Sequence, residues 1–218
     1  MQVYLVANPK GGSGKSTLAT NLAGLLAWKG EAGGVSRVML GDIDRQQSSR
    51  FWIERRPPEL PRIEAWEAAD GKRLKAPRGT THAVLDSPAG LHGDRLKEAL
   101  KLAQRVLVPV QPSVFDIFAT QAFFEELAGM KAARGLDVGL VGMRMNERSR
   151  ASDEFERYIE TTGLPLVGRL RNTQNYVHLA AQGLTLFDVT PSRVAADLEQ
   201  WASIDAWLAI EPLPPGLD

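Results

Sequence analysis

Short apolar runs recur along the chain, and most of them are continuous rather than alternating with polar residues. They span residues 3–7, 38–40, 83–85, 106–110 and 138–141. Continuous runs of this length are typical of strands buried on both faces, as in a parallel sheet that is covered by helices. The pattern therefore predicts a sheet of mainly parallel strands at the centre of the fold.

Helical patterns fill the intervals between these runs. We expect helices over residues 16–28, 94–103, 116–134, 152–162, 173–182 and 194–210. Because strands and helices alternate, the chain is predicted to be an α/β protein. Its architecture would be a single doubly wound, mostly parallel sheet with helices on both faces.

Two segments break this alternation. Residues 30–35 are rich in glycine, and we interpret them as a flexible link between the first helix and the second strand. Residues 55–78 hold four prolines and many charges, which favours a loop with one possible strand around residues 63–66. The chain as a whole suits one domain over residues 1–211, followed by a proline-rich tail over residues 212–218.

The composition narrows the possible partners. Lys and Arg together number 26, as do Asp and Glu, so the formal net charge is zero and DNA binding would need a local basic patch. The chain has no cysteine, which excludes disulfides, thiolate metal sites and a cysteine nucleophile. We see neither a signal-peptide pattern nor an apolar run near the roughly 20 residues that span a bilayer. We therefore expect a soluble, cytoplasmic protein.

The strongest candidate for chemistry directly follows the first apolar run. It is the octapeptide of Lys10, Gly11, Gly12, Ser13, Gly14, Lys15, Ser16 and Thr17. In such a glycine-rich loop between a strand and a helix, backbone N–H groups wrap a polyphosphate and the helix N-terminus adds its positive dipole end. Lys15 would reach the β- and γ-phosphates, and the Ser16 hydroxyl would ligate Mg²⁺. Pro9 stands at the usual first glycine of this motif, and Lys10 adds a second lysine.

Carboxylates follow two further apolar runs. Asp42 and Asp44 come after the second run, and Asp86 ends the third. The carboxyl ends of parallel strands form the ligand-binding edge of such a sheet. Asp86 fits the pattern of a strand-end aspartate that holds Mg²⁺ directly or through water.

The loop sequence KGGSGKS resembles the deviant Walker A box of the ParA/MinD family of P-loop ATPases, and the resemblance covers almost the whole chain. It implies ATP and Mg²⁺ as cofactors. It also implies an ATP-dependent homodimer, in which Lys10 reaches across the interface to the nucleotide of the other subunit. Residues 42–46 resemble the family's D-x-D-P-Q motif, with Arg45 in place of the proline. By that resemblance Asp44 orients or activates the attacking water, and Asp42 lies nearer the Mg²⁺ shell.

Two other segments carry the same resemblance. Residues 88–90, Pro-Ala-Gly, are similar to the family's switch segment, which responds to the γ-phosphate. Residues 108–116 are similar to the proline-containing loop at the dimer face of small, ParF-like members, although a merely structural turn is also compatible with them. In relatives an amide side chain often reads the base, which points to Asn146, and a loop asparagine that caps the next helix is an equal alternative.

Arginines supply candidate DNA contacts, because non-specific binding needs cations that neutralise phosphates. One cluster is Arg144, Arg148 and Arg150, and the other is Arg169 with Arg171. The latter pair lies in a segment that resembles the family's short strand-to-helix element near its DNA surface. A solvated charged face is the alternative for each arginine.

Two functions from different classes remain. The first is a ParA-type ATPase that binds the nucleoid as an ATP dimer and positions a cargo, with hydrolysis stimulated by a ParB-like adaptor. The cargo could be a plasmid, a chemoreceptor cluster or a protein microcompartment. The second is a metabolic P-loop enzyme similar to dethiobiotin synthetase, which phosphorylates a small carboxylate. Membrane attachment is not expected, because residues 191–218 contain one basic residue against five acidic ones.

Overall fold

The computed structural model describes residues 1–33, 37–43, 48–66, 77–146 and 149–210. Its centre is a seven-stranded sheet with the order β3-β2-β4-β1-β5-β6-β7, in which every neighbouring pair is parallel. The strands are β1 (Gln2–Val6), β2 (Val38–Asp42), β3 (Ile63–Trp66), β4 (His82–Asp86), β5 (Arg105–Val110), β6 (Asp137–Met145) and β7 (Leu166–Arg171). All five apolar runs of the sequence are strands, and the strand considered around residues 63–66 is present as well.

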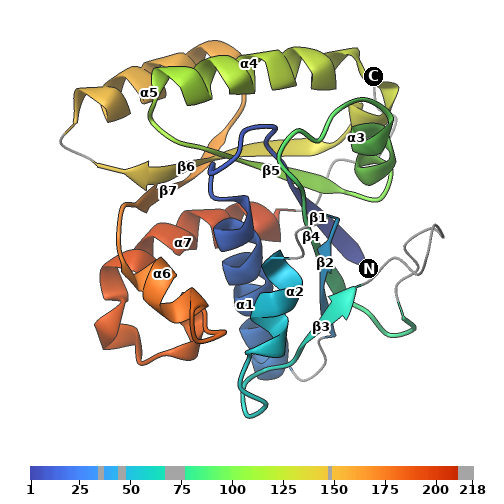
Figure 1. Cartoon of the computed structure of the whole chain (residues 1–218), viewed down its shortest axis with the longest axis vertical. Helices are drawn as coiled ribbons and strands as arrows, with labels where there is room; N and C mark the ends of the chain where they lie inside the picture. The colour runs from blue at the N-terminus through green and yellow to red at the C-terminus, as the bar shows by residue number, and fades with distance from the viewer. Residues whose placement is uncertain (34–36, 44–47, 67–76, 147–148, 211–218) are drawn as a thin grey trace.

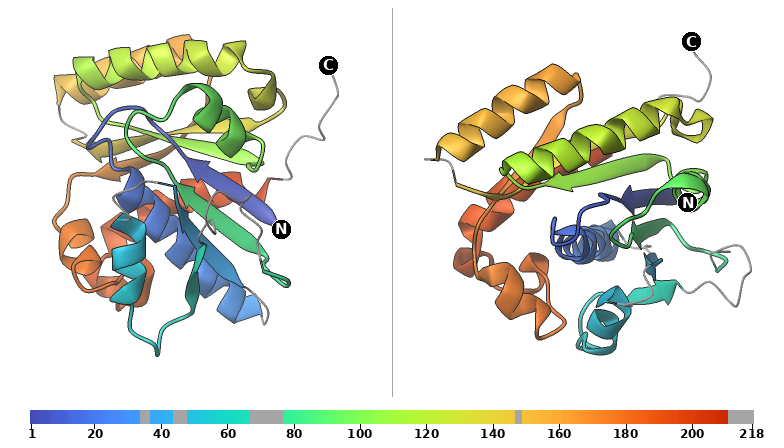
Figure 2. Two further views of the ribbon diagram at one scale, coloured as in Figure 1. Left: turned by 45° about the vertical axis from the view of Figure 1, so that its right-hand side comes forward. Right: turned by 45° about the horizontal axis from the view of Figure 1, so that its top comes forward.

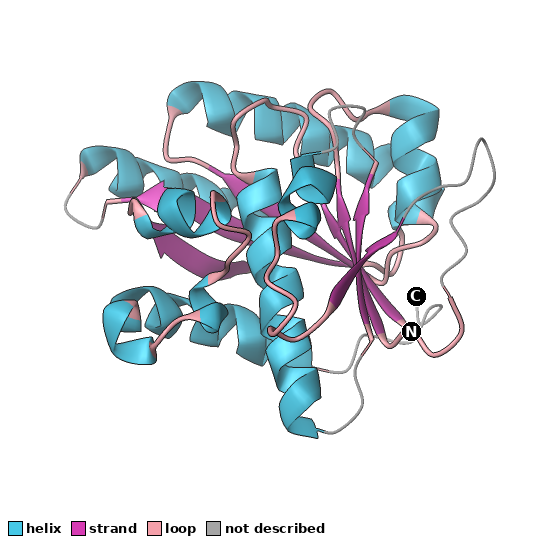
Figure 3. Cartoon of the chain, turned by 60° about the horizontal axis from the view of Figure 1, so that its bottom comes forward, coloured by secondary structure: helices cyan, strands magenta, loops and turns pink. Residues whose placement is uncertain are grey.

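Helices cover both faces of the sheet, as Figures 1 and 2 show. One face packs against α1 (Lys15–Gly33), α2 (Ser48–Glu54), α6 (Asn175–Ala180) and α7 (Ala195–Ala209). The other packs against α3 (Gly93–Leu100), α4 (Val114–Gly129) and α5 (Arg150–Thr162). Short 3-10 segments are η1 (Lys131–Ala133), η2 (Leu186–Asp188) and η3 (Pro191–Arg193). The predicted doubly wound architecture is confirmed, and Figure 3 shows the strands fanned out between the two helix layers.

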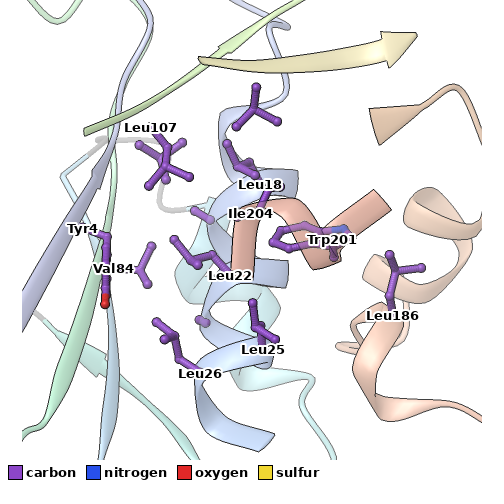
Figure 4. Close-up of a cluster of buried hydrophobic side chains, with 14 of the residues drawn as sticks. Tyr4, Leu18, Leu22, Leu25, Leu26, Val84, Leu107, Leu186, Trp201 and Ile204 are labelled. Atoms are coloured by element: carbon purple, nitrogen blue, oxygen red, sulfur yellow. The ribbon is translucent and has the colours of Figure 1, made fainter. Parts of the chain in front are cut away.

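The first helix is the centre of one hydrophobic core. Every residue from 18 to 27 is buried, because the sheet lies on one side of α1 while α6, η2 and α7 close the others. Figure 4 shows Leu18, Leu22 and Leu25 of α1 beside Trp201 and Ile204 of α7. Gly24 allows the closest approach, since a Cβ atom there would lie 2.6 Å from the Thr185 hydroxyl. The helix that follows the glycine-rich loop is thus held by packing against the sheet and the C-terminal elements.

Two sequence-based assignments need correction, the end of the first helix and the absence of a helix after the second strand. Helix α1 continues to Gly33, so residues 30–33 are helical rather than a flexible link. Two contacts next to this end hold the extension in place. The Trp28 indole donates to Asp188 Oδ1 over 2.7 Å, and Lys29 pairs with Asp205 at 2.5 Å. Helix α2 and its position between the second and third strands were not predicted.

The C-terminal pattern is confirmed as core packing. Val194, Trp201, Ile204 and Leu208 are each less than 10% exposed, and α7 packs against β7. In the part of the chain that the structure describes, no helix is both long and apolar enough to cross a membrane. The proline-rich tail proposed for residues 212–218 lies outside the described residues.

Candidate functional site

The glycine-rich loop joins β1 to α1 at the carboxyl edge of the sheet. Gly12 and Gly14 have φ angles of 77° and 99°, a backbone region that side chains with a Cβ rarely adopt. At Gly14 a Cβ atom would also lie 2.7 Å from the Met143 methyl group. The loop therefore requires glycine at both positions, which leaves its backbone open to a ligand.

Lys15 and Lys10 are both held beside this loop. The Lys15 side chain is 8% exposed, and its Nζ donates to the Lys10 carbonyl over 2.8 Å. Lys10 instead extends to the start of α4, where its Nζ forms an ion pair with Asp116. That carboxylate is almost fully buried and also accepts from the Ser113 hydroxyl at 2.8 Å. Reaching another subunit would therefore require Lys10 to leave Asp116.

The predicted metal ligands meet next to the loop. Asp42 and Asp86 are register partners at the ends of β2 and β4, which places their carboxylates on the same edge. Burial raises the pKa of Asp86 from 3.8 to about 6. Hydrogen bonds from Ser49 and Ser16 oppose this rise, the Asp42 charge adds to it, and Lys15 lowers it. The pKa of Asp86 thus depends on three predicted site residues, Ser16, Asp42 and Lys15.

This arrangement fits a magnesium ion that is bound together with a phosphate ligand. Mg²⁺ prefers oxygen ligands and is usually held by one or two carboxylates plus substrate phosphates. Asp86 is 2% exposed, and its Oδ1 atom has no hydrogen-bond partner, which is a costly arrangement unless a ligand uses that oxygen. Within the described ranges, no group of three or more His, Cys, Asp or Glu side chains is arranged to hold a metal ion by itself. A metal here would need the Ser16 hydroxyl and oxygens of the nucleotide to complete its shell.

The sequence analysis missed Ser49 as a member of this site. It lies in the first turn of α2 and is fully buried. Its backbone N–H donates to Asp42 Oδ2 over 2.9 Å, and its hydroxyl donates to Asp86 Oδ2 over 2.6 Å. Its position three residues after the D-x-D-R-Q segment of residues 42–46 was the one sequence feature that could have pointed to it. Asp44, the predicted catalytic carboxylate, lies outside the described residues.

The segment after β4 contacts the glycine-rich loop. Gly90 has a φ angle of 70°, and its N–H donates to the Pro9 carbonyl over 2.7 Å. Ser87 is 3% exposed, and its hydroxyl has no hydrogen-bond partner. Because this segment touches the loop directly, a change in the phosphates bound there could be transmitted to it.

The proline-containing segment between β5 and α4 forms the neighbouring surface. The Gln111 amide donates to the Gly12 carbonyl, and Asn8 links β1 to the same region through the Pro109 carbonyl at 2.9 Å. Beyond these contacts the first turns of α4 expose large apolar side chains. Val114 is 54%, Phe115 79% and Phe118 64% exposed.

A cavity of about 290 Å³ opens beside Gly14 and Thr17, and Met143, Asn172 and Tyr176 are among the other residues that line it. Asn146 does not line this cavity but an adjoining open groove of about 800 Å³. Its predicted role in base binding stays a prediction, whereas Asn172 is the strand-end amide that lies next to the glycine-rich loop. The sequence analysis did not single out Asn172, although it directly follows a strand.

The adjoining groove joins the two arginine clusters of the sequence. Arg144, Arg169 and Arg171 all line it. Arg169 pairs with Glu156 at 2.6 Å, with both side chains about half exposed, and Arg171 pairs with the fully buried Asp197 at 2.5 Å. Arg150 is exposed at the start of α5, and Arg148 lies outside the described residues.

The fold and the site together define a P-loop nucleotide-binding protein. Comparison with known families identifies the family to which it belongs. Residues 4–186 match the model of the CobQ/CobB/MinD/ParA nucleotide-binding domain, so the chain belongs to that family. The resemblance to the ParA/MinD ATPases is thereby confirmed, and we classify the chain as an ATPase of this kind.

Individual relatives agree with this placement. The chain is 28% identical over 200 residues to "maintenance of carboxysome distribution protein A" of Halothiobacillus neapolitanus, covering 88% of this chain and 90% of that protein. Among solved structures, an ATP complex of Cyanothece McdA superposes with a TM-score of 0.75 at 16% identity, covering 98% of each chain. The MinD cell division protein of Aquifex aeolicus gives 0.74 at 17% identity, covering 99% of this chain and 100% of that one.

Proposed function

We propose that the chain is a ParA-type positioning ATPase. The observation that carries the proposal is the meeting of the two-lysine loop with Asp42 and Asp86 at one sheet edge. In this proposal Lys15 and the loop backbone hold the phosphates of ATP, while Ser16, Asp42 and Asp86 hold Mg²⁺. The bound ion would offset phosphate charge, and Asp44 would orient the attacking water.

The nucleobase would lie in the cavity beside Gly14 and Thr17. Asn172 and Tyr176 line that cavity, so an amide and an aromatic ring are available to a base. The cavity lies directly beside the glycine-rich loop that would hold the phosphates, which supports this assignment.

Dimerisation on ATP is the second part of the proposal. Lys10 would leave Asp116 and contact the nucleotide of the partner subunit. The exposed side chains of Val114, Phe115 and Phe118 lie on the same helix as Asp116. A surface with three large apolar side chains is suited to burial against protein. These residues would therefore become buried when the two subunits meet.

Non-specific DNA binding is the third part. Arg144 and Arg169 lie on one groove and are both exposed. The exposed pair between Arg169 and Glu156 is worth only about 0–1 kcal/mol, so a phosphate could replace Glu156 at little cost. Two such grooves in a dimer would reinforce one another. The ATP-bound dimer would thus associate with the nucleoid.

The cargo we favour is a large protein assembly rather than a plasmid. Two relatives, from Halothiobacillus neapolitanus and Gloeobacter kilaueensis, are both named for the maintenance of carboxysome distribution, each at 28% identity. A ParB-like adaptor protein would connect the assembly to the ATPase and stimulate hydrolysis.

DNA retention tests the proposal directly. Purified protein is applied to immobilised random-sequence DNA with ADP, ATP or a non-hydrolysable analogue, at two salt concentrations. We expect retention with ATP and the analogue only, weaker at the higher salt concentration because counterion release drives such binding. Asp44→Ala should prolong retention with ATP, since it would block hydrolysis.

The same samples test the alternative function. A metabolic enzyme related to dethiobiotin synthetase would not change its oligomeric state with ATP and would hydrolyse ATP only with its small carboxylate substrate. An ATP-independent oligomer without DNA retention would therefore contradict the positioning function.

A further inference from the structure

Ser49 contacts both candidate metal-binding carboxylates, although it belongs to a different element from either. It is fully buried at the start of α2. Its N–H bonds Asp42 Oδ2 at 2.9 Å, and its hydroxyl bonds Asp86 Oδ2 at 2.6 Å. Ser49 thus connects the ends of β2 and β4 with α2.

These two contacts have different explanations. The N–H bond to Asp42 satisfies a donor in the first turn of the helix, as any helix start requires. The hydroxyl bond to Asp86 is not needed for the helix, because it leads away from α2 to a neighbouring strand. This bond therefore calls for an explanation within the site itself.

The two carboxylate oxygens of Asp86 differ in their hydrogen bonding. Oδ2 accepts from Ser49, whereas the buried Oδ1 has no hydrogen-bond partner. A carboxylate held through one oxygen loses rotational freedom, and its other oxygen stays available to a cation. Ligand carboxylates in metal sites are commonly fixed by such outer hydrogen bonds.

We propose that Ser49 is a positioning residue for magnesium, one whose hydroxyl fixes Asp86 so that Oδ1 binds the ion that accompanies the nucleotide. This inference rests on the proposed nucleotide site. It assigns Ser49 no contact with the reacting atoms. The serine also connects the metal site to α2, which carries the buried Trp52.

Ser49→Ala separates the two contacts, because it removes the hydroxyl and keeps the N–H bond to Asp42. The full-length protein is titrated with ATP at a series of MgCl₂ concentrations, starting in EDTA, and the dissociation constant is measured by calorimetry. We expect the magnesium concentration for half-maximal enhancement of ATP binding to rise by about 10-fold or more. Affinity for ATP in EDTA should match that of the wild type.

Ser152→Ala is the matched control. Ser152 is also a buried serine in the first turn of a helix, α5. Its hydroxyl accepts from the Asn146 N–H over 3.3 Å and from the Ser149 hydroxyl over 3.1 Å. It lies on the opposite helix layer. Its substitution should leave the magnesium requirement unchanged, and thermal unfolding of both variants should show folded protein.

The outcomes distinguish the two proposals. An unchanged magnesium requirement in Ser49→Ala, or an equal loss of ATP affinity with and without magnesium, would overturn the role of Ser49 alone. Wild-type protein that binds no ATP at any magnesium concentration would overturn the proposed function and this inference with it.

Discussion

Replacing Asp86 by asparagine removes a carboxylate that the fold buries almost completely. Because burial raises its pKa from 3.8 to about 6, the folded protein binds a proton here more tightly than the unfolded chain does. The free energy of unfolding therefore falls as the pH rises from about 4 to about 6. At roughly 1.4 kcal/mol for each pH unit, the ionised carboxylate costs about 3 kcal/mol above that window.

The asparagine variant should not pay this electrostatic cost. Its amide keeps an oxygen that can accept from Ser49, so the main change is the loss of charge. We expect Asp86→Asn to be more stable than the wild type by up to about 3 kcal/mol at pH 8 and by almost nothing at pH 4. For a protein of this size that corresponds to a rise in Tm of roughly 6–12 °C.

Thermal and urea unfolding at several pH values between 4 and 8, in EDTA and without nucleotide, would measure this difference. Glu160→Gln is a control, because it removes an exposed carboxylate. In a second series with ATP present throughout, the addition of Mg²⁺ should raise the Tm of the wild type further but should not change that of Asp86→Asn. A variant that is less stable than the wild type at pH 8, or one that keeps the same pH dependence, would refute the reasoning.

Four further variants have clear expected outcomes. Lys15→Ala should abolish ATP binding in calorimetry, since the phosphates lose the lysine at the helix start. Lys10→Ala should still bind ATP but remain monomeric with the non-hydrolysable analogue in light scattering. Gly24→Ala should destabilise the fold by about 1–2 kcal/mol in urea unfolding, because overpacking exceeds the gain in helix propensity. Arg144→Glu combined with Arg169→Glu should abolish DNA retention while ATP-dependent dimerisation persists.

The strands and the phosphate loop were predictable because local patterns determine them. Continuous apolar runs located the central strands, and the glycine spacing located the loop. The meeting of Asp42 with Asp86 also followed, since parallel strands place their carboxyl ends on one edge. These inferences needed no knowledge of distant contacts.

The features that were missed depend on pairs far apart in the sequence. The ion pair of Lys10 spans 106 positions and the hydrogen bond of Ser49 to Asp86 spans 37. The extension of α1 past Trp28 rests on contacts with residues 160 and 176 positions away. Propensity alone favours a break at the glycines there, and tertiary packing overrides it.

The carboxyl edge of the sheet also holds an unusual share of the buried polar atoms that lack a hydrogen-bond partner. Six buried side-chain polar atoms among the described residues lack a hydrogen-bond partner, and three of them belong to Asp86, Ser87 and Asp116. Asp86 and Asp116 contact the glycine-rich loop through Ser16 and Lys10, and the Ser87 N–H bonds the Val6 carbonyl at the end of the strand that leads into that loop. Folded proteins rarely leave buried polar atoms unpaired. The stability of the fold does not explain why three of these atoms lie close to one loop. Bound Mg²⁺ would provide a partner for the Asp86 carboxylate oxygen, and a phosphate oxygen would provide one for the Ser87 hydroxyl, so ATP with Mg²⁺ accounts for two of these three atoms.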